Sequence, residues 1–356
     1  MQTIKLLEIL IKFKKSKIKA RDGKEIGKYP LYTCSPILNK YLDEYIYDDE
    51  AIILGTGGNP VINYYKGKFA TSTDCFTVKS NDKFYTKYIY YFLTANVNKI
   101  ESMFRGAGLK HLNKNELLDM EVNFINKNVQ AEIIKKLDMI NCLFELKNKQ
   151  LEELDTIIKS QFVEMFGDPI QNSLKWNTDT INNVAPTQNY KGTFENKVWL
   201  LGLDMVESNS GRIINYLYED VKNIGSSTCT FNEENILYSK LRPYLNKVVI
   251  PNKKGYATSE LVPLKPNKDK LNRYFLAYLL RSEQFVQYIS EKVVGAKMPR
   301  VSMDMFRNFN LILPPIELQN KFANIVQQID KQKFEIENSL KEMQKLYENL
   351  MEKYFG

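Results

Sequence analysis

The sequence predicts an α+β protein in which two similar mixed α/β domains are separated by two long antiparallel helices. A shift of 189 positions (355 − 166) carries Phe166-Gly167 onto Phe355-Gly356 and Gln130 onto Gln319, which indicates an internal duplication with a pseudo-twofold arrangement. A chain of 356 residues also normally divides into about two domains. We therefore expect domains at residues 1–127 and 168–316, and helices at 128–167 and 317–356.

Both long runs, Asn128–Met165 and Glu317–Tyr354, have apolar residues in alternating steps of four and three, as helices that pair in a coiled coil do. Lys147, Gln161 and Lys333 interrupt these steps, and each corresponds to an apolar residue in the other run, which suits two unlike helices that pair with each other. Two amphipathic helices on separate cores remain an alternative. The expected pairing residues are Ile133, Leu137, Ile140, Leu151, Leu154 and Ile158, with Phe322, Val326, Ile329, Ile336, Leu340 and Met343.

The composition is that of an ordinary globular protein, with 44% hydrophobic and 26% charged residues. A net charge of +8 favours a polyanionic partner only weakly, because nucleotide bias in a genome also produces lysine-rich chains. The cysteines Cys34, Cys75, Cys142 and Cys229 lie far apart, and the single His111 does not complete a familiar metal site with them. No apolar run approaches the roughly 18 residues of a membrane span, so we expect a cytoplasmic protein without a membrane segment or metal.

Residues 1–28 turn strongly basic after a short apolar segment, and Tyr29–Tyr32 then begins a series of short strand-like pieces. The lysines form either a solvated face or a contact for phosphate groups. The candidate contacts are Lys14, Lys15, Lys17 and Lys19.

The glycine-rich segment Gly55–Pro60 lies between the expected strands Ala51–Leu54 and Val61–Tyr65. It lacks the Lys-Ser or Lys-Thr of a phosphate-binding P-loop, and a strand follows it instead of a helix. A nucleotide or cofactor site in an enzyme is therefore the less favoured interpretation. Glycine lets backbone N–H groups approach a ligand, so Gly57, Gly58 and Asn59 are candidate contacts.

A basic turn followed by an aromatic residue and Ala-Thr-Ser occurs in both halves of the chain. Cations and hydroxyl groups at a strand edge suit contacts with phosphates or base edges, but a hairpin repeated only for folding has the same pattern. The candidates are Lys66, Lys68, Thr71 and Ser72 in the first half, and Lys253, Lys254, Thr258 and Ser259 in the second.

Each half continues with an aromatic helix, Tyr85–Leu93 or Tyr274–Leu280, and then a basic glycine-containing loop, 105–111 or 295–300. The halves differ most where the first has its glycine-rich segment, because the second has Ser239-Lys240-Leu241-Arg242-Pro243 there. A common scaffold with divergent loops predicts two modules that read two different short targets. The candidate contacts are Arg105, Lys110 and His111 in the first half, and Lys240, Arg242, Lys247, Lys297 and Arg300 in the second.

Three segments carry a resemblance to a known family: 165–169 after the first helix, 238–247, and Leu311–Gln319 at the start of the second helix. Trp199–Ile214, which contains the candidate DNA contact Arg212, is similar to the opening of one class of recognition domain. With these motifs the chain resembles, over essentially its whole length, the specificity subunit of a type I restriction-modification system. One departure is the start of the first helix, where Asn126 or Asn128 replaces Pro314-Pro315 as the expected cap.

The resemblance implies a non-catalytic subunit that binds double-stranded DNA at a bipartite target. It would position two adenine-N6 methyltransferase subunits, which use S-adenosylmethionine, and a restriction subunit with translocase and nuclease activity, which uses ATP and Mg. No cofactor is expected in this chain, which has no Asn-Pro-Pro-Tyr or Asp-Pro-Pro-Tyr motif of adenine methylases. A coiled-coil adaptor that does not read DNA remains an alternative, as does the enzyme discussed above.

Overall fold

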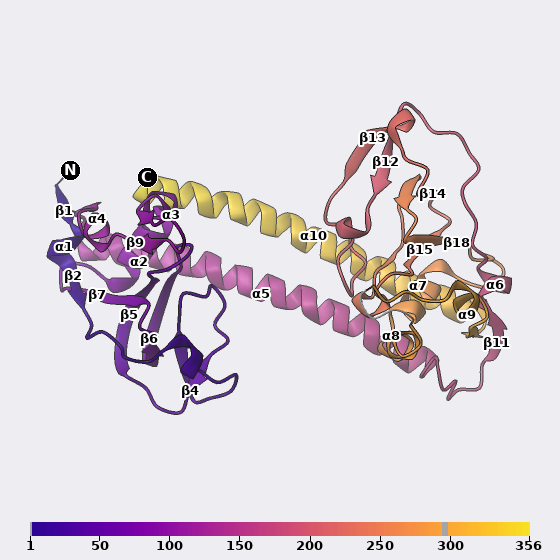
Figure 1. Ribbon diagram of the computed structural model, residues 1–356, viewed down its shortest axis with the longest axis horizontal. Coiled ribbons are helices and arrows are strands. Elements are labelled where there is room, and N and C mark those ends of the chain that lie inside the picture. Colours follow the sequence, from indigo (N-terminus) through magenta and orange to yellow (C-terminus); the bar gives the residue numbers. More distant parts are fainter. Residues whose placement is uncertain (1, 294–297) are drawn as a thin grey trace. The chain divides into compact units, whose positions relative to one another are not determined.

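The computed structural model describes residues 2–293 and 298–356, and it divides into two compact units (Figure 1). Unit 1 consists of residues 1–148 and 337–356, and unit 2 consists of residues 149–336. The expected division gives each long helix a segment of its own, whereas the compact units share both helices. Each unit therefore contains one recognition domain, the beginning of one long helix and the end of the other.

The two long helices, α5 (Lys127–Phe166) and α10 (Ile316–Phe355), each have 40 residues. They extend the expected runs by one residue at each end. The Asn126 side-chain oxygen accepts a hydrogen bond from the Val129 N–H at 3.0 Å, so Asn126 is the cap of α5. Gly167 ends this helix with φ +72°, and its N–H donates to the Val163 carbonyl at 2.8 Å.

The main sheet of unit 1 has six strands in the order β2-β7-β5-β6-β3-β4, and only the β3–β6 pair is parallel. Its central strand β5 contains an unbroken apolar run because both faces are covered. Ile52 and Leu54 face one core, whereas Ala51 and Ile53 face another. The strands are β2 (Leu10–Lys12), β3 (Tyr29–Tyr32), β4 (Tyr41–Leu42), β5 (Tyr47–Gly55), β6 (Ile62–Thr71) and β7 (Cys75–Ser80).

Two short strand pairs and several helices complete unit 1. Strand β1 (Thr3–Lys5) pairs with β10 (Glu121–Asn123), and β8 (Phe104–Arg105) pairs with β9 (His111–Leu112). The larger core lies between the sheet, the aromatic helix α2 and the two long helices. The shorter helices are α1 (Leu6–Ile9), η1 (Ala20–Asp22), α2 (Thr86–Ala95), α3 (Val97–Glu101) and α4 (Lys114–Leu118).

Unit 2 has a four-stranded sheet in the order β13-β12-β17-β14, a three-stranded sheet β16-β15-β18, and the pair β11–β19. Trp199, which is 1% exposed, fills the core of the four-stranded sheet. The strands are β11 (Asn177–Thr180), β12 (Lys197–Leu201), β13 (Leu217–Asp220), β14 (Thr228–Phe231), β15 (Ile236–Ser239), β16 (Val248–Val249), β17 (Gly255–Thr258), β18 (Leu261–Leu264) and β19 (Asn310–Leu313).

Two of the shorter helices of unit 2 have clear counterparts in unit 1. The aromatic helix α7 corresponds to α2, and α9 corresponds to α4 at the shift of 189 residues. The helices are α6 (Ile181–Val184), η2 (Leu203–Met205), η3 (Val221–Asn223), η4 (Pro243–Leu245), α7 (Arg273–Arg281), α8 (Glu283–Ser290) and α9 (Met303–Arg307).

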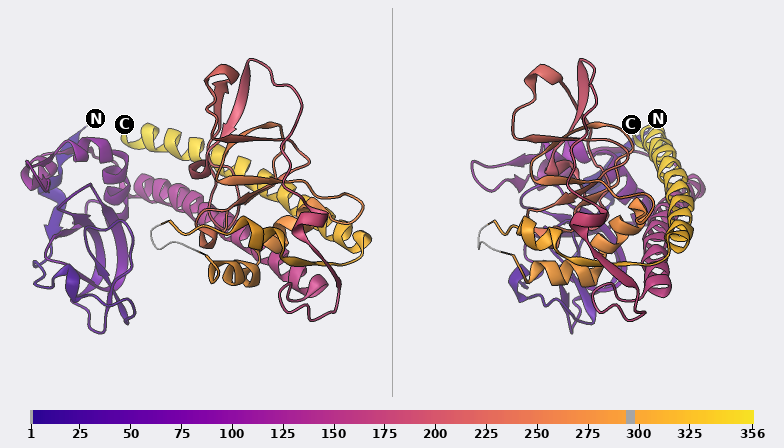
Figure 2. Two further views of the ribbon diagram at one scale, coloured as in Figure 1. Left: turned by 45° about the vertical axis from the view of Figure 1, so that its right-hand side comes forward. Right: turned by 90° about the vertical axis from the view of Figure 1, so that its right-hand side faces the viewer.

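Within each unit, α5 and α10 lie side by side with opposite directions (Figures 1 and 2). In unit 1 the end of α10 packs beside the start of α5, and the Phe355 ring lies 5.1 Å from the Tyr88 ring of α2. In unit 2 the end of α5 packs beside the start of α10, and Phe166 lies 4.7 Å from Phe275 of α7. The aromatic helix of each unit thus receives the end of a long helix that began in the other unit.

All twelve expected pairing residues are buried or half-buried, and Leu137, Ile158, Phe322 and Val326 are fully buried. Two of them, Ile133 and Leu137, also belong to the core of unit 1, together with residues of α2 and α4. The Lys333 ammonium, which interrupts the apolar pattern, lies 2.5 Å from the Asp155 carboxylate within unit 2. Each helix therefore contributes one member of an ion pair at this position.

Among the helices that the structure describes, none has the length and apolarity needed to cross a membrane. Within residues 2–293 and 298–356, no group of His, Cys, Asp and Glu side chains is arranged to hold a metal ion.

Candidate nucleic-acid interface

Unit 1 joins the glycine-rich segment to the basic loop that follows the aromatic helix. The Gly58 N–H donates to the Lys110 carbonyl at 3.0 Å, and the Leu112 N–H donates to the Thr56 carbonyl at 3.0 Å. Thr56 is held in turn, because its hydroxyl donates to the Asp74 carbonyl at 2.8 Å. We name residues 55–60 and 105–111 the loop pair of unit 1.

Unit 2 contains the same junction with different side chains. The Arg242 N–H donates to the Pro299 carbonyl at 2.8 Å, and the Val301 N–H donates to the Lys240 carbonyl at 2.9 Å. We name residues 239–247 and 298–300 the loop pair of unit 2. Both junctions therefore use two backbone hydrogen bonds between corresponding positions, and the side chains are left to vary.

The two loop pairs share an unusual backbone conformation at one position. Gly58 has φ +84°, and Arg242, at the corresponding position of unit 2, has φ 48°. A left-handed backbone costs a residue with a Cβ atom about 1 to 2 kcal/mol. Buried Pro243 follows Arg242, and the Leu245 N–H donates to the Arg242 carbonyl at 2.9 Å. This backbone is therefore fixed on both sides, while the Arg242 side chain is exposed.

Some of the expected DNA-contacting cations are already neutralised or sequestered by the protein. Arg105 pairs with Glu116 at 2.6 Å, and Arg212 pairs with Glu207 at 3.1 Å. Lys68 lies 4.0 Å from Asp48, Lys247 donates to the Leu203 carbonyl at 2.9 Å, and Lys254 donates to the Thr193 carbonyl at 3.1 Å. These five side chains would have to exchange a partner before they contacted DNA.

Lys253 is sequestered more completely. Its ammonium lies 4.5 Å from the Tyr216 ring, 4.9 Å from the Tyr218 ring and 5.2 Å from the Trp199 ring. Cation–π attraction from three rings holds this charge against the sheet. A phosphate contact by Lys253 stays a prediction, and in this conformation the ammonium is held by the rings.

The remaining expected cations have no carboxylate or aromatic partner among the described residues. They are Lys14, Lys15, Lys17, Lys19, Lys66, Lys110, Lys240, Arg242 and Arg300, and all but half-buried Lys240 are exposed. Gly57, Asn59 and His111 complete the loop pair of unit 1, where Gly57 and His111 form a β-bridge. Lys297 lies outside the described residues.

The Ala-Thr-Ser segments take part in packing and strand pairing, and contact of these residues with DNA stays a prediction. Thr71 and Ser72 are each 1% exposed, and the Ser72 N–H donates to the Tyr32 carbonyl at 2.8 Å. The Thr258 hydroxyl is buried, and the Ser259 N–H donates to the Ser227 carbonyl at 3.1 Å. These segments end β6 and β17 and hold them to neighbouring strands, which favours the alternative interpretation of a hairpin repeated for folding.

Sequence analysis missed a further cation beside the basic segment of unit 1. Burial, followed by the positive charges of Lys15 and Lys12, lowers the pKa of the Lys114 ammonium. Lys114 follows the loop pair directly in the chain, whereas Lys12 and Lys15 are distant in sequence. Only the fold brings these charges together, and an anion beside them would relieve their repulsion.

The glycine-rich segment does not form a cofactor cradle. It connects β5 to β6, which pair antiparallel as a hairpin over Tyr47–Phe69. A phosphate cradle of the common nucleotide-binding type needs the N-terminus of a helix directly after the glycines. The geometry therefore argues against the enzyme interpretation.

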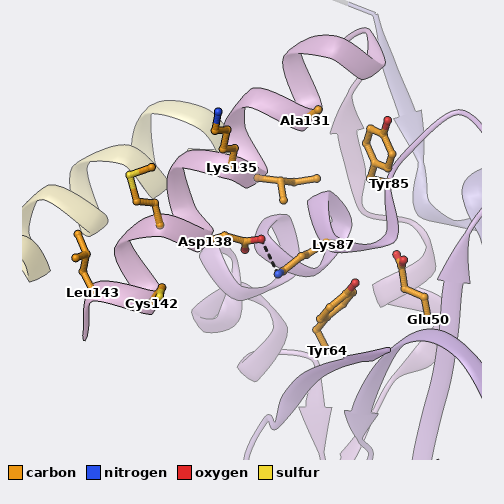
Figure 3. Close-up of a pocket in the computed structure, with 11 residues that line it drawn as sticks. Glu50, Tyr64, Tyr85, Lys87, Ala131, Lys135, Asp138, Cys142 and Leu143 are labelled. Carbon is orange, nitrogen blue, oxygen red and sulfur yellow. Dashed lines mark hydrogen bonds and ion pairs between the residues drawn. The ribbon is translucent and has the colours of Figure 1, made fainter. Parts of the chain in front are cut away.

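A separate cavity of about 750 Å³ lies in unit 1 between α5 and the β5–β6 hairpin (Figure 3). Two lysines, Lys87 and Lys135, and two carboxylates, Glu50 and Asp138, line it. Lys87 is neutralised by Asp138 at 2.7 Å, and its ammonium also lies 5.1 Å from the Tyr64 ring. Burial and the hydrogen bond to Asp138 raise the pKa of Tyr91 beside this pair. The paired charges make this cavity a poor site for a polyanion, in contrast to the loop pairs.

Comparisons with known proteins show which family the chain matches. The family described as the type I restriction modification DNA specificity domain matches residues 1–156 and 174–344. The type I restriction enzyme EcoDI specificity subunit of Escherichia coli is 24% identical over 397 aligned positions, which cover 99% of this chain and 87% of that protein. The MjaVIII specificity subunit of Methanocaldococcus jannaschii is 24% identical and covers 90% of this chain and 85% of its own.

Solved structures share the fold. The S subunit of a type I restriction-modification system from M. genitalium has a TM-score of 0.68 at 14% identity, covering 100% of this chain and 96% of that one. A chain from a structure on complex assembly and conformational transition of the type I R-M system has a TM-score of 0.57 at 13% identity. The match covers 99% of this chain and 97% of that one.

Proposed function

Because this chain belongs to the family of type I restriction-modification DNA specificity domains, we propose that it reads a bipartite DNA target with two loop pairs, one for each half of the target. The chain is the non-catalytic DNA-recognition subunit of its system. Residues 1–127 would form one reading module and residues 168–316 the other. Each module would present its loop pair to one half-site.

The observation that carries this proposal is the pair of equivalent junctions. The backbone bonds of Gly58 and Arg242 to the basic loops are the same, but one junction presents glycine and the other presents arginine. Glycine allows a close approach of the backbone, whereas an exposed guanidinium can donate two hydrogen bonds to a guanine edge. One scaffold would therefore recognise two different short sequences.

The free cations support the sequence-independent part of DNA binding. Lys14, Lys15 and Lys17 lie on the exposed basic segment of unit 1. Lys114, which lies over the Phe76 ring at 5.3 Å, adds to their positive charge, since after burial the charge of Lys15 lowers its pKa. Phosphate contacts of this kind fix the register of a protein on the duplex and make the affinity depend on salt. The loop pairs would then read base edges within the position that these contacts set.

The partners follow from the family as further proposals. Two adenine-N6 methyltransferase subunits would bind S-adenosylmethionine and methylate the target. A restriction subunit would use ATP and Mg for translocation and cleavage. This chain would select the DNA target and position those subunits on it. The partner subunits would carry out the chemistry.

The loop pair of unit 2 gives the most direct test. Replacing Lys240 and Arg242 with alanine should weaken binding to DNA that carries the target motif by roughly 1 to 3 kcal/mol if Arg242 reads a guanine. The matched control is K265A/K268A, because both lysines of unit 2 pair with Glu234. The target itself comes from methylome sequencing of cells with and without this chain.

Two outcomes would contradict the proposal. Unchanged affinity and unchanged base preference in the K240A/R242A protein would remove Arg242 from the reading surface. Absence of both a bipartite methyladenine motif and salt-dependent DNA affinity would instead favour the adaptor interpretation.

A further inference from the structure

Gln130 is a fully buried polar residue near the start of α5. Its side-chain oxygen accepts from the Tyr85 N–H at 2.9 Å, and its amide nitrogen donates to the Ile125 carbonyl at 2.9 Å and the Lys83 carbonyl at 3.1 Å. The two N–H donors of the amide and its oxygen are therefore all engaged with backbone groups.

Gln319 makes the same three bonds in unit 2. It is also fully buried, and its side-chain oxygen accepts from the Asn272 N–H at 2.9 Å. Its amide nitrogen donates to the Pro314 carbonyl at 2.7 Å and the Lys270 carbonyl at 3.0 Å. The internal repeat thus keeps the residue, its burial and each of its partners.

Each glutamine joins three parts of its unit at one point. Tyr85 and Asn272 directly precede the aromatic helices α2 and α7. Ile125 and Pro314 lie between the last strand of the domain and the long helix. The side chain therefore ties the long helix to the strand that leads into it and to the first turn of the aromatic helix.

An apolar side chain of similar size would fill the same space but would leave these backbone groups without their partner. Apolar contacts also tolerate small rotations, whereas three directional hydrogen bonds fix one angle between domain and helix. The chain from loop 105–111 reaches Gln130 through only α4 and β10, and the corresponding segment of unit 2 reaches Gln319 through α9 and β19. The angle of the domain on its helix therefore determines the direction in which the loop pair points.

We infer that Gln130 and Gln319 are positioning residues, each of which fixes the orientation of one loop pair on the long helices and so the fidelity with which one half-site is read. This inference rests on the proposed reading of DNA by the loop pairs. By this inference, two residues that do not touch DNA determine how well the target is discriminated. Each of them acts on one half of the target.

The test uses the complex of this chain with its methyltransferase subunits. Methylation is measured on duplexes that carry the native target, a one-base-pair change of spacer, or a single substitution in either half-site. Gln130→Leu should lower the discrimination against substitutions in one half-site by about tenfold and leave the other half-site unaffected. Gln319→Leu should have the converse effect, and exposed Gln150→Leu on α5 is the matched control.

Hydrogen exchange of the Tyr85 amide reports whether its bond to the side chain at position 130 has been lost. If Gln130→Leu does not fold, Gln130→Met fills the same space with an unbranched chain and also removes the three bonds, and it should show the same half-specific effect. Native discrimination at both half-sites combined with faster Tyr85 exchange would overturn the inference, and so would an equal loss at both half-sites. A wild-type complex without discrimination would overturn the proposed function and this inference together.

Discussion

Unit 1 and unit 2 differ in what they present and agree in how they present it. At the junction of the two loops unit 1 has Gly58 and unit 2 has Arg242, yet both are left-handed and both donate to a corresponding carbonyl. Behind that position, Gln130 and Gln319 make the same three bonds. The repeat has therefore kept the groups that set geometry and has changed the groups that face outward.

The largest expected effect tests whether the two modules act independently. Exchanging residues 1–127 for the matching module of a relative should replace one half of the methylated motif completely and leave the other half unchanged. The reason is that each loop pair is built within its own unit. Methylome sequencing of cells with the hybrid chain measures both halves at once, and a change in both would show that the units do not read separately.

A second experiment changes the part that both units share. Insertion of one heptad into each long helix, after Gln150 and after Ser339, keeps the apolar pattern and lengthens each helix by about 10.5 Å. If the helices set the distance between half-sites, the spacer should grow by roughly 3 base pairs. The added base pairs also rotate one half-site by about a quarter turn about the DNA axis. The change in spacer length is therefore smaller, or the activity lower, unless the DNA twists to compensate.

The spacer in the methylated motif of the lengthened protein is the measurement for this second experiment. An active complex with the original spacer would show that helix length does not set the distance. Insertion into only one helix serves as the control, because it puts the two apolar faces out of register and should reduce stability.

The smallest expected effect concerns the left-handed position itself. Gly58→Ala should lower the free energy of unfolding by about 1 kcal/mol through backbone strain alone, because no atom of the residues that the structure describes lies within 4 Å of the added Cβ. Arg242→Gly should raise it by up to about 1 kcal/mol and still weaken DNA binding. Urea denaturation and DNA titration check the two predictions, and an Arg242→Gly protein of lower stability would show that the arginine backbone is unstrained.

The arrangement along the chain was predictable because it is local. Alternating apolar spacing defines α5 and α10 to one residue, and the cap at Asn126 follows from the chemistry of its amide. The duplication was predictable because Phe166-Gly167 and Phe355-Gly356 mark the ends of equivalent elements. These features need no knowledge of which distant segments meet.

The state of individual site residues was not predictable, because it depends on contacts between distant segments. Thr71 looks like a surface hydroxyl beside a basic turn, yet the β3–β6 pairing buries it. Lys253 looks like a free cation, yet β12, β13 and Tyr216 just before β13 supply the rings around it. Lys114 carries no motif, and only the packing of the basic segment beside α4 places it near Lys15.

The reciprocal packing of the helix ends has an evolutionary consequence. Phe166 at the end of α5 packs on Phe275 of the second domain, and Phe355 at the end of α10 packs on Tyr88 of the first. An ancestral chain of half the length, with one domain and one helix, would have carried a helix end that fitted a second copy of itself. Two such chains would have closed as a symmetric dimer, and fusion of two duplicated genes would then have freed each loop pair to diverge without disturbing the assembly.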